Sequence, residues 1–234
     1  MKKLLLSLLL LLSVGILRAQ PDFTSPNGTS NNVYPFNSTV NRAQWIYHPG
    51  DFTPAITPGY ITKLYVMVHP TLGSSNTSNF TNLTINMGHT TNANTVNGAW
   101  LTGMTNVLTA PTLSVVATQN QWAEFTLQTP FFYDGVSNLL MEISQTGYNP
   151  GFYIVNNDQT GSRRAWGTVG SLVTTGAGSG LMYMGIDMLN ENDMGVIGIT
   201  KPSDLNDICA GLSKFTVEVK NFGANDILSG NVSY

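Results

Sequence analysis

The segment that decides the fold runs from Tyr60 to His69 and reads YITKLYVMVH. Apolar and polar side chains alternate along it. One face carries the apolar residues Leu64, Val66 and Val68, and the opposite face carries Lys63, Tyr65 and His69. A period of two is typical of a β-strand with one buried face, because successive side chains of a strand point to opposite sides. The segment therefore predicts a strand that packs one face on a core.

The same alternation recurs further along the chain. Its apolar positions are Leu83, Ile85 and Met87, then Ala123, Phe125 and Leu127, then Leu139, Met141 and Ile143. Residues 152–155 and 181–188 read as further strands, and turn-rich stretches at residues 149–151 and 176–180 separate the strands. No segment has the period and length of a three-turn helix. We expect each strand to bury one face only.

These strands predict an all-β fold. Antiparallel strands with one wet face hide the other face by pairing two sheets, so we expect an antiparallel β-sandwich of jelly-roll type over residues 20–190. After Asp187 the alternation restarts, at residues 193–199 and again at residues 215–219. We interpret residues 191–234 as the opening of an immunoglobulin-like β-domain. Such a domain needs about 100 residues, so we expect it to be incomplete at Tyr234.

Residues 1–19 have the composition of a secretory signal peptide. Lys2 and Lys3 give a basic start, residues 4–17 are mainly apolar, and Ala19 is a small residue at the expected cleavage site. The apolar stretch is short for a hydrocarbon layer ~30 Å thick, so we expect cleavage after Ala19 and no stable membrane span afterwards. An uncleaved anchor is the alternative. The expected location is therefore secreted, either extracellular or at the cell surface.

The charge balance argues against nucleic acid as a partner. The chain has 10 basic and 13 acidic residues, and loss of the signal peptide would leave 7 basic residues and a net charge of −6. Its longest basic cluster is Arg163-Arg164, whereas a phosphate backbone needs a basic stripe. Cys209 is the only cysteine. It is either an inert buried thiol or half of a disulfide whose partner lies beyond Tyr234.

The sequence contains no catalytic or zinc-binding motif. Its three histidines, His48, His69 and His89, are isolated and lack the spacing of a zinc site. No serine lies in a Gly-x-Ser-x-Gly elbow, and no motif ties two carboxylates together as in a glycosidase. We therefore expect a protein that is not an enzyme and that has no cofactor and no metal ligands.

Residues 156–166 hold the densest mixture of polar and aromatic side chains. The candidate ligand-binding residues are Asn157, Asp158, Arg163, Arg164 and Trp166. Sugar recognition uses an aromatic face beneath the ring and a few placed polar groups at its edge, so we expect a shallow site for a glycan or a peptide. The alternative is that Trp166 packs on the sandwich and the two arginines are solvated.

The start of this stretch can also be interpreted as a calcium site. Residues 156–160 read Asn-Asn-Asp-Gln-Thr and offer carboxylate, amide and hydroxyl oxygens, which are the ligands that calcium takes. The chemistry of tight turns explains the same residues. Both interpretations stay open at the level of the sequence.

Several short motifs, taken in order, resemble a known family. They lie at residues 42–47, 61–64, 83–90, 122–127 and 130–142. Together they resemble the N-terminal jelly-roll-like domain of large bacterial surface proteins exported by the type IX route. The tail from Asp193 onward, with Pro202, Cys209 and residues 215–219 and 221–223, resembles the immunoglobulin-like adhesion modules that follow in such proteins.

The resemblance implies attachment to the cell surface, a later partner for Cys209, and no catalytic motif. The family includes adhesins and the non-catalytic regions of secreted hydrolases. We therefore expect a secreted or cell-surface binding or adhesion module that recognises a glycan or an extracellular protein through its loops. One alternative is the non-catalytic N-terminal part of a larger secreted protease or glycosidase. Another is a structural spacer without a ligand.

Overall fold

The computed structural model describes residues 20–71, 77–190, 194–201 and 216–221, together with Gly223 and Asp226. The expected signal peptide and the segment around Cys209 lie outside the described residues. Within the described part all strand pairs are antiparallel, and the one helical element there is the short 3₁₀ turn η1 (Pro49–Asp51). No helix in these ranges is long and apolar enough to cross a membrane.

The strands are short to medium in length and follow one another with brief connections. The first seven are β1 (Phe23–Thr24), β2 (Ser30–Asn32), β3 (Arg42–Tyr47), β4 (Gly59–Met67), β5 (Ser78–Thr90), β6 (Thr105–Val115) and β7 (Trp122–Tyr133). The next seven are β8 (Asn138–Ser144), β9 (Gly147–Tyr148), β10 (Ile154–Asp158), β11 (Arg164–Gly167), β12 (Gly176–Gly178), β13 (Gly180–Met182) and β14 (Met184–Asn190). The last two are β15 (Met194–Lys201) and β16 (Thr216–Asn221).

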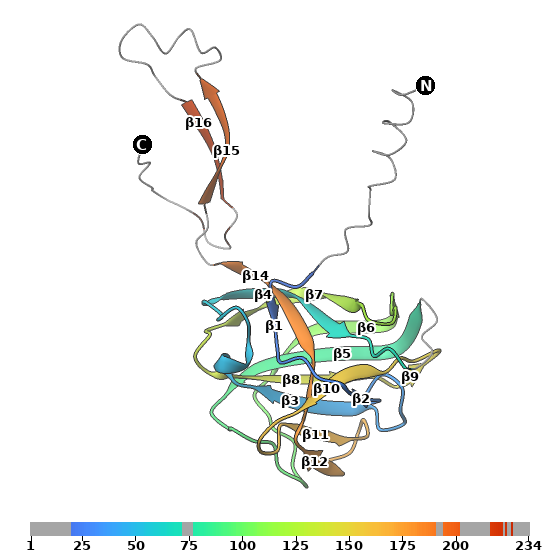
Figure 1. Cartoon of the computed structure of the whole chain (residues 1–234). Coiled ribbons are helices and arrows are strands. Elements are labelled where there is room, and N and C mark those ends of the chain that lie inside the picture. The colour runs from blue at the N-terminus through green and yellow to red at the C-terminus, as the bar shows by residue number, and fades with distance from the viewer. Residues whose placement is uncertain are drawn as a thin grey trace, which may run out of the picture.

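Strands β1 to β14 form two layers around one core (Figure 1). The first layer is a seven-stranded sheet in the order β12-β11-β3-β8-β5-β6, with β9 paired to β5. The second layer combines a four-stranded sheet, β1-β14-β4-β7, with a three-stranded sheet, β13-β10-β2. A bridge between Val68 and Ile154 joins these two smaller sheets. The predicted all-β antiparallel sandwich is confirmed, and its jelly-roll type stays a prediction.

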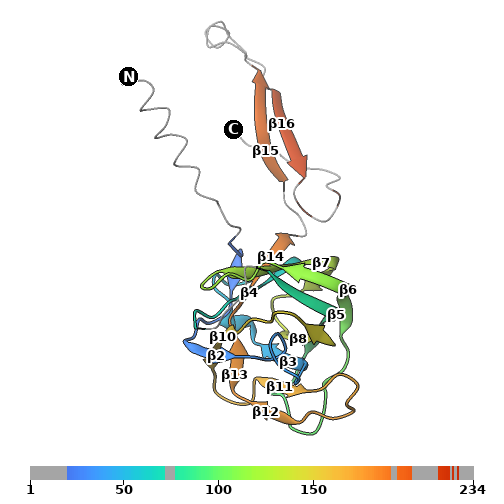
Figure 2. The ribbon, with the colours of Figure 1, turned by 90° about the vertical axis from the view of Figure 1, so that its right-hand side faces the viewer.

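One departure from the expected strands lies toward the C-terminus. The stretch at residues 176–180, expected as a turn, forms β12 and the start of β13. Its small residues fit beside the indole of Trp166 on the paired strand β11, where a Cβ at Gly176 would collide with the ring. Further on, β15 and β16 pair as a separate two-stranded sheet, which stands apart from the sandwich in both views (Figure 1, Figure 2). Both strands lie where the alternation restarts. The immunoglobulin-like type of residues 191–234 stays a prediction.

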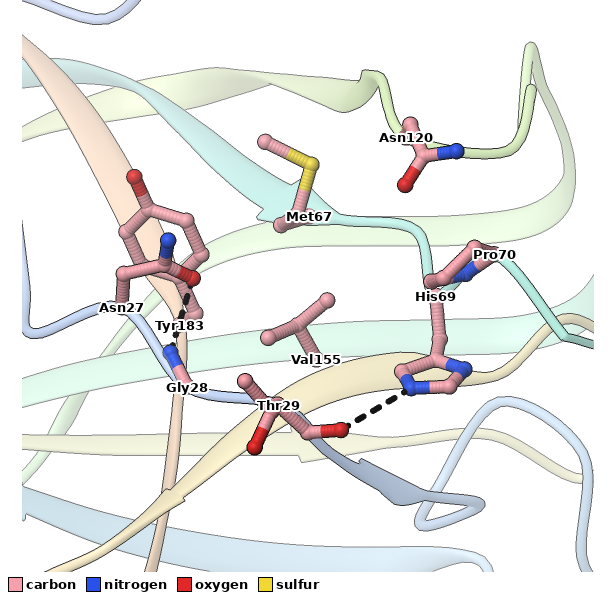
Figure 3. Close-up of a pocket in the computed structure, with 9 residues that line it drawn as sticks. All are labelled: Asn27, Gly28, Thr29, Met67, His69, Pro70, Asn120, Val155 and Tyr183. Atoms are coloured by element: carbon pink, nitrogen blue, oxygen red, sulfur yellow. Dashed lines mark hydrogen bonds between the residues drawn. The ribbon is translucent and has the colours of Figure 1, made fainter.

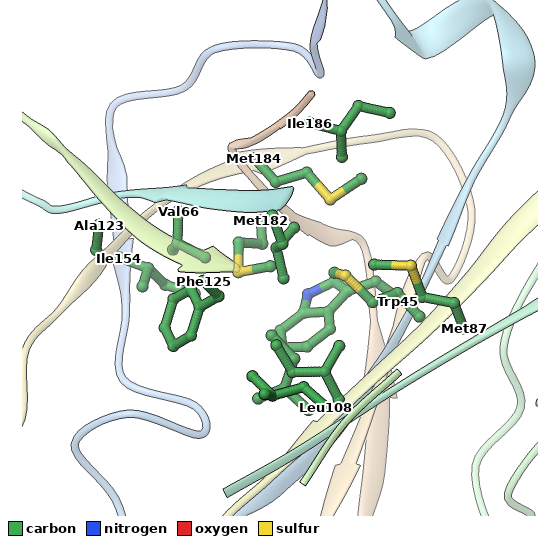
Figure 4. Close-up of a cluster of buried hydrophobic side chains, with 14 of the residues drawn as sticks. Trp45, Val66, Met87, Leu108, Ala123, Phe125, Ile154, Met182, Met184 and Ile186 are labelled. Carbon is green, nitrogen blue, oxygen red and sulfur yellow. The ribbon is translucent and has the colours of Figure 1, made fainter. Parts of the chain in front are cut away.

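The core consists of the alternating apolar residues of both layers. Figure 4 shows Trp45, Met87 and Leu108 of the seven-stranded sheet gathered with Val66 and Phe125 of the four-stranded sheet. All the apolar positions picked out by the alternation in β4, β5, β7 and β8 are buried. Because a slip by one residue would turn each of these sets toward water, the pattern fixes both the strands and their register.

Strands β3 and β8 are buried on both faces. The alternation predicted β8 but not β3, and the prediction that each strand buries one face was wrong for β8. Glu142 of β8 points away from the core and is only 5% exposed. Its Oε2 accepts hydrogen bonds from Arg42 Nη2 and Gln44 Nε2, both at 2.8 Å, and its Oε1 accepts one from Asn86 Nδ2 at 3.0 Å. A buried carboxylate is thus fully paired, which its burial requires.

The segment between β5 and β6 covers this polar network. The Trp100 ring lies over Arg42, with 4.0 Å between the guanidinium carbon and the ring centroid. Gln44 Nε2 donates to the carbonyl of Leu101 at 2.9 Å, and Gln44 Oε1 accepts from the N–H of Leu101 at 3.0 Å. Trp100 Nε1 also donates to the carbonyl of Ser171 at 3.0 Å. The covering segment shows no alternation of apolar and polar residues. The sequence pattern therefore did not indicate that this face of the sheet is covered.

Replacing Glu142 should destabilise the sandwich strongly. In Glu142→Gln the charge of Arg42 loses its partner in a largely buried position, and breaking a buried pair costs roughly 3–5 kcal/mol. The side chain of Arg42 is 22% exposed, so we expect a loss of about 3 kcal/mol in the free energy of unfolding. Urea unfolding followed by tryptophan fluorescence measures it.

Glu124→Gln is the matched control. Glu124 pairs with Lys63 at 3.2 Å, but both side chains are about one-third exposed, and surface pairs contribute less than about 1 kcal/mol. Equal losses in the two variants would contradict a structural role for the Glu142 network.

Candidate functional site

The five residues predicted as a ligand site lie on and between β10 and β11, but they do not form one site. Arg164 and Trp166 share one face of β11. Arg163 comes directly before Arg164 and points to the opposite side, as successive residues of an extended chain do. Asn157 and Asp158 are likewise successive residues of β10. The alternation of the backbone therefore separates side chains that are adjacent in the sequence.

Arg163 is a structural residue. It is 3% exposed, its Nε donates to the Ile46 carbonyl at 2.8 Å, and its Nη2 forms an ion pair with Asp51. Asp51 also accepts a hydrogen bond from the His48 N–H at 2.6 Å. The interpretation of a solvated arginine was wrong for Arg163, because its guanidinium ties the η1 turn to the start of β11.

Arg164 and Trp166 close one rim of the sandwich. The guanidinium carbon of Arg164 lies 4.8 Å from the Trp166 ring centroid and 5.7 Å from that of Tyr34, and the two rings stack at 5.7 Å. Burial lowers the pKa of Arg164, although Tyr34 and Asp158 act in the opposite direction. A Cβ at Gly176 would lie 2.4 Å from the Trp166 indole. Trp166 thus packs on the sandwich, as the alternative interpretation expected.

Asn157 and Asp158 bond to other parts of the protein. The Asn157 amide donates to the carbonyl of Asn27 and accepts from Gln159. Asp158 Oδ1 accepts from Ser179 Oγ at 3.3 Å. The oxygens proposed for calcium therefore lie on alternate sides of β10 rather than around one point. In the described part of the chain no group of three or more His, Cys, Asp and Glu side chains could hold a metal ion.

A cavity of about 400 Å³ lies beside Arg163. Its lining consists of His48, Asp51, Ala93, Asn94, Gln159, Thr160, Gly161 and Arg163. The two charged groups in it, Asp51 and Arg163, pair with each other, and His48 Nε2 lies 3.1 Å from the carbonyl of Ala93. The charged groups of this cavity are therefore already used within the protein.

A second hollow has several polar side-chain groups without a partner among the described residues. This groove of about 370 Å³ lies where the two smaller sheets meet, and it is lined by Asn27, Gly28, Thr29, Met67, His69, Pro70, Asn120, Val155 and Tyr183. Figure 3 shows Asn27 and Tyr183 at one end and His69 and Asn120 at the other, with Met67 and Val155 between them. Its volume lies within the range of about 300–1,000 Å³ of ligand sites. We call it the Tyr183 groove.

One wall of the groove, residues 27–29, is fixed by contacts from behind. His69 Nδ1 accepts from the Thr71 N–H at 3.2 Å, so in the neutral ring Nε2 carries the proton and donates to the Thr29 carbonyl at 3.4 Å. Gly28 lies directly against β10, where a Cβ would come within 2.1 Å of the Asn156 carbonyl oxygen. Asn157, one of the predicted site residues, supports the same wall through the carbonyl of Asn27.

The floor of the groove is fixed by backbone hydrogen bonds. The Tyr183 N–H donates to the Val155 carbonyl at 3.0 Å, and the Tyr183 carbonyl accepts from the Met67 N–H at 3.1 Å. The His69 and Asn120 N–H groups donate to the carbonyls of Tyr153 and Val68 at 2.8 and 3.0 Å. The groove is therefore built on paired backbone.

Four side chains of the groove keep hydrogen-bonding groups without a partner among the described residues. They are the Nδ2 of Asn27, the hydroxyl of Thr29, the amide of Asn120 and the hydroxyl of Tyr183. Asn120 has a φ of 58°, in the left-handed region, where asparagine is tolerated better than most residues. The groove thus combines an apolar floor with free polar groups at its ends, the pattern of a small-ligand site.

Aromatic side chains continue the groove over the outer face of the four-stranded sheet. The Trp122 ring lies 4.8 Å from Tyr183, and its Nε1 donates to Gln20 Oε1 at 3.2 Å. Tyr65 packs edge-on against Trp122 and donates its hydroxyl to Asp187 at 2.6 Å. Tyr65 is 1% exposed, although the sequence placed it on the polar face, because these rings cover it. The ring of Tyr183 is therefore held from one side.

Sequence reasoning missed the Tyr183 groove. Its lining residues are spread along the chain between Asn27 and Tyr183, and none of the contributing segments forms a motif. The one available signal was the alternation itself, since burial of Met182 and Met184 turns Tyr183 outward. No family model matches the chain, and no curated protein and no solved structure matches it. A proposal about function therefore rests on the geometry of the groove.

Adding one methyl group at Gly28 should move the groove wall. In Gly28→Ala the new Cβ would overlap the backbone of β10, and overpacking of this kind costs about 1–3 kcal/mol. We expect a lower melting temperature and changed NMR shifts for residues 27–29 and Val155.

Gly50→Ala is the control, since a Cβ there meets nothing within 4 Å. It should leave both the melting temperature and the shifts of the groove residues unchanged. A wall that tolerated Gly28→Ala equally well would contradict the close contact between residues 27–29 and β10.

Proposed function

We propose that this protein is a non-catalytic binding or adhesion module that acts outside the cell or at its surface and holds an extracellular ligand in the Tyr183 groove. The observation that carries the proposal is the set of free polar groups around an apolar floor. Asn27, Thr29 and Asn120 are exposed and Tyr183 is half-buried, so their polar groups are accessible to a ligand. Their convergence at one preformed hollow supports a binding role.

The buried charged residues of the described chain fit a non-catalytic role. Arg163 and Glu142 are buried and form ion pairs, and Arg164 packs on the ring of Trp166. None of them lines the Tyr183 groove. The two titratable side chains of the groove, His69 and Tyr183, lie at opposite ends of it (Figure 3), and His69 uses both ring nitrogens for hydrogen bonds within the protein.

The composition and the family resemblance support the location. A signal peptide at residues 1–19 and an N-terminal jelly-roll-like domain of type IX-exported proteins would place the sandwich outside the cell. The alternative, a non-catalytic N-terminal part of a larger secreted hydrolase, uses the same groove to hold a substrate near a separate active domain. Activity assays on the gene product would separate the two.

Binding to immobilised ligands tests the proposal. We expect the purified protein to bind saturably to at least one member of a glycan array or to fibronectin or collagen. Thr29→Trp, which fills the groove from an exposed position, should lower that binding more than about tenfold. Thr112→Trp, at an exposed position of β6 in the other layer, should leave it unchanged.

Three results would count against the proposal. One is the absence of saturable binding to both panels. Another is equal binding by the wild-type protein and Thr29→Trp. The third is turnover of a bound glycan or protein by this chain alone, which would contradict the non-catalytic assignment.

A further inference from the structure

We infer that the Tyr183 groove takes an uncharged sugar, at the end or within a neutral glycan, rather than an acidic glycan or a peptide. The inference rests on the proposed function and names the ligand class of the same site. It follows from the charge of the groove, from its free hydrogen-bonding groups and from the pairing of its backbone.

The lining residues provide no charge to balance a charged ligand. None of the nine is Asp, Glu, Lys or Arg. Of the two titratable side chains, Tyr183 has a neutral phenol as its ordinary form, and His69 uses both ring nitrogens for hydrogen bonds to the protein. Removing an unpaired charge from water is costly, so the groove disfavours carboxylated and sulfated sugars and charged peptide side chains.

Three charged groups on the outer face of the four-stranded sheet pair with one another. Lys63 Nζ lies 3.2 Å from Glu124 and 3.8 Å from Asp187, and Asp187 also accepts from the Tyr65 hydroxyl. A ligand charge in the groove would therefore find no unpaired counter-charge among these three residues.

The free groups of the groove match sugar hydroxyls. Amides carry both donors and acceptors, and hydroxyls act as either. A sugar hydroxyl also donates and accepts. It can therefore form a hydrogen bond with each of the four side chains, Asn27, Asn120, Thr29 and Tyr183. The C–H faces of a pyranose ring fit the apolar floor of Met67 and Val155 and the side of Tyr183, which Figure 3 places at the left of the groove.

A peptide would not find the partners that it needs here. Peptides bound along a sheet form hydrogen bonds with an unpaired strand edge. The N–H groups of Met67, His69, Asn120 and Tyr183 all donate within the protein. The groove therefore offers side-chain groups rather than a free backbone edge, which favours a sugar over an extended peptide.

Calorimetric titration with matched neutral and acidic sugars tests the inference. The neutral probes are cellotriose, xylotriose, mannotriose and chitobiose, and the acidic probes are trigalacturonate and 3′-sialyllactose. We expect at least one neutral probe to bind, at least about tenfold more tightly than either acidic probe. Its affinity should hardly change between low and high salt, because a neutral interface has no charge to screen.

Two variants report on the groove without disturbing the fold. Tyr183→Phe removes only a hydroxyl, and Asn120→Gly removes an amide while keeping a residue that accepts a positive φ. Each should weaken the neutral sugar about fivefold, the equivalent of one hydrogen bond. Asn82→Gly is the control, because Asn82 also has a positive φ, 47°, but lies on β5 in the other layer. It should leave the affinity unchanged.

The outcomes separate the inference from the proposed function. Tighter binding of an acidic probe overturns the inference. Saturable binding of fibronectin or collagen also overturns it if Tyr183→Phe or Asn120→Gly weakens that binding. In both cases the proposed function as a binding module stands. A neutral sugar that binds Tyr183→Phe and Asn120→Gly as tightly as wild type also overturns it. Absence of binding to all sugars and proteins overturns both.

Discussion

The backbone of Tyr183 is the constraint on which the second layer of the sandwich depends. Its N–H bonds to β10 and its carbonyl to the end of β4, so one residue joins the three-stranded and the four-stranded sheets. Met182 and Met184 on either side point into the core. The same alternation that buries these two methionines presents the tyrosine side chain at the junction. The core and the groove are therefore consequences of one stretch of extended chain.

Much of the fold could be predicted because one physical rule governs it. The alternation at Leu83, Ile85 and Met87 or at Leu139, Met141 and Ile143 reports burial directly, and all six residues are buried. The rule failed where a covering segment hides a second face. Glu142 reads as solvent-facing because the chain that covers it and Gln44, around Trp100 and Leu101, has no periodic pattern of its own.

The candidate site was far less accessible to sequence reasoning. Arg163 and Arg164 are adjacent in the chain, but the pleat of the strand sends one to Asp51 and the other to Tyr34. A dense polar stretch is therefore a poor guide to a site in a β-protein. The Tyr183 groove has the opposite character, since its residues are individually ordinary and become a site only through pairing between distant strands. Which distant strands pair is decided by the topology of the whole sandwich, and the pattern of a single segment does not reveal it.

The left-handed backbone at Asn120 limits how this groove can change over evolutionary time. Few residue types tolerate that conformation, chiefly glycine, asparagine and aspartate. Replacement by glycine removes an amide, and replacement by aspartate introduces a negative charge at the mouth. The backbone at this one position thus favours a few side chains of different polarity, and under the proposed binding role it restricts which polar groups the mouth can present.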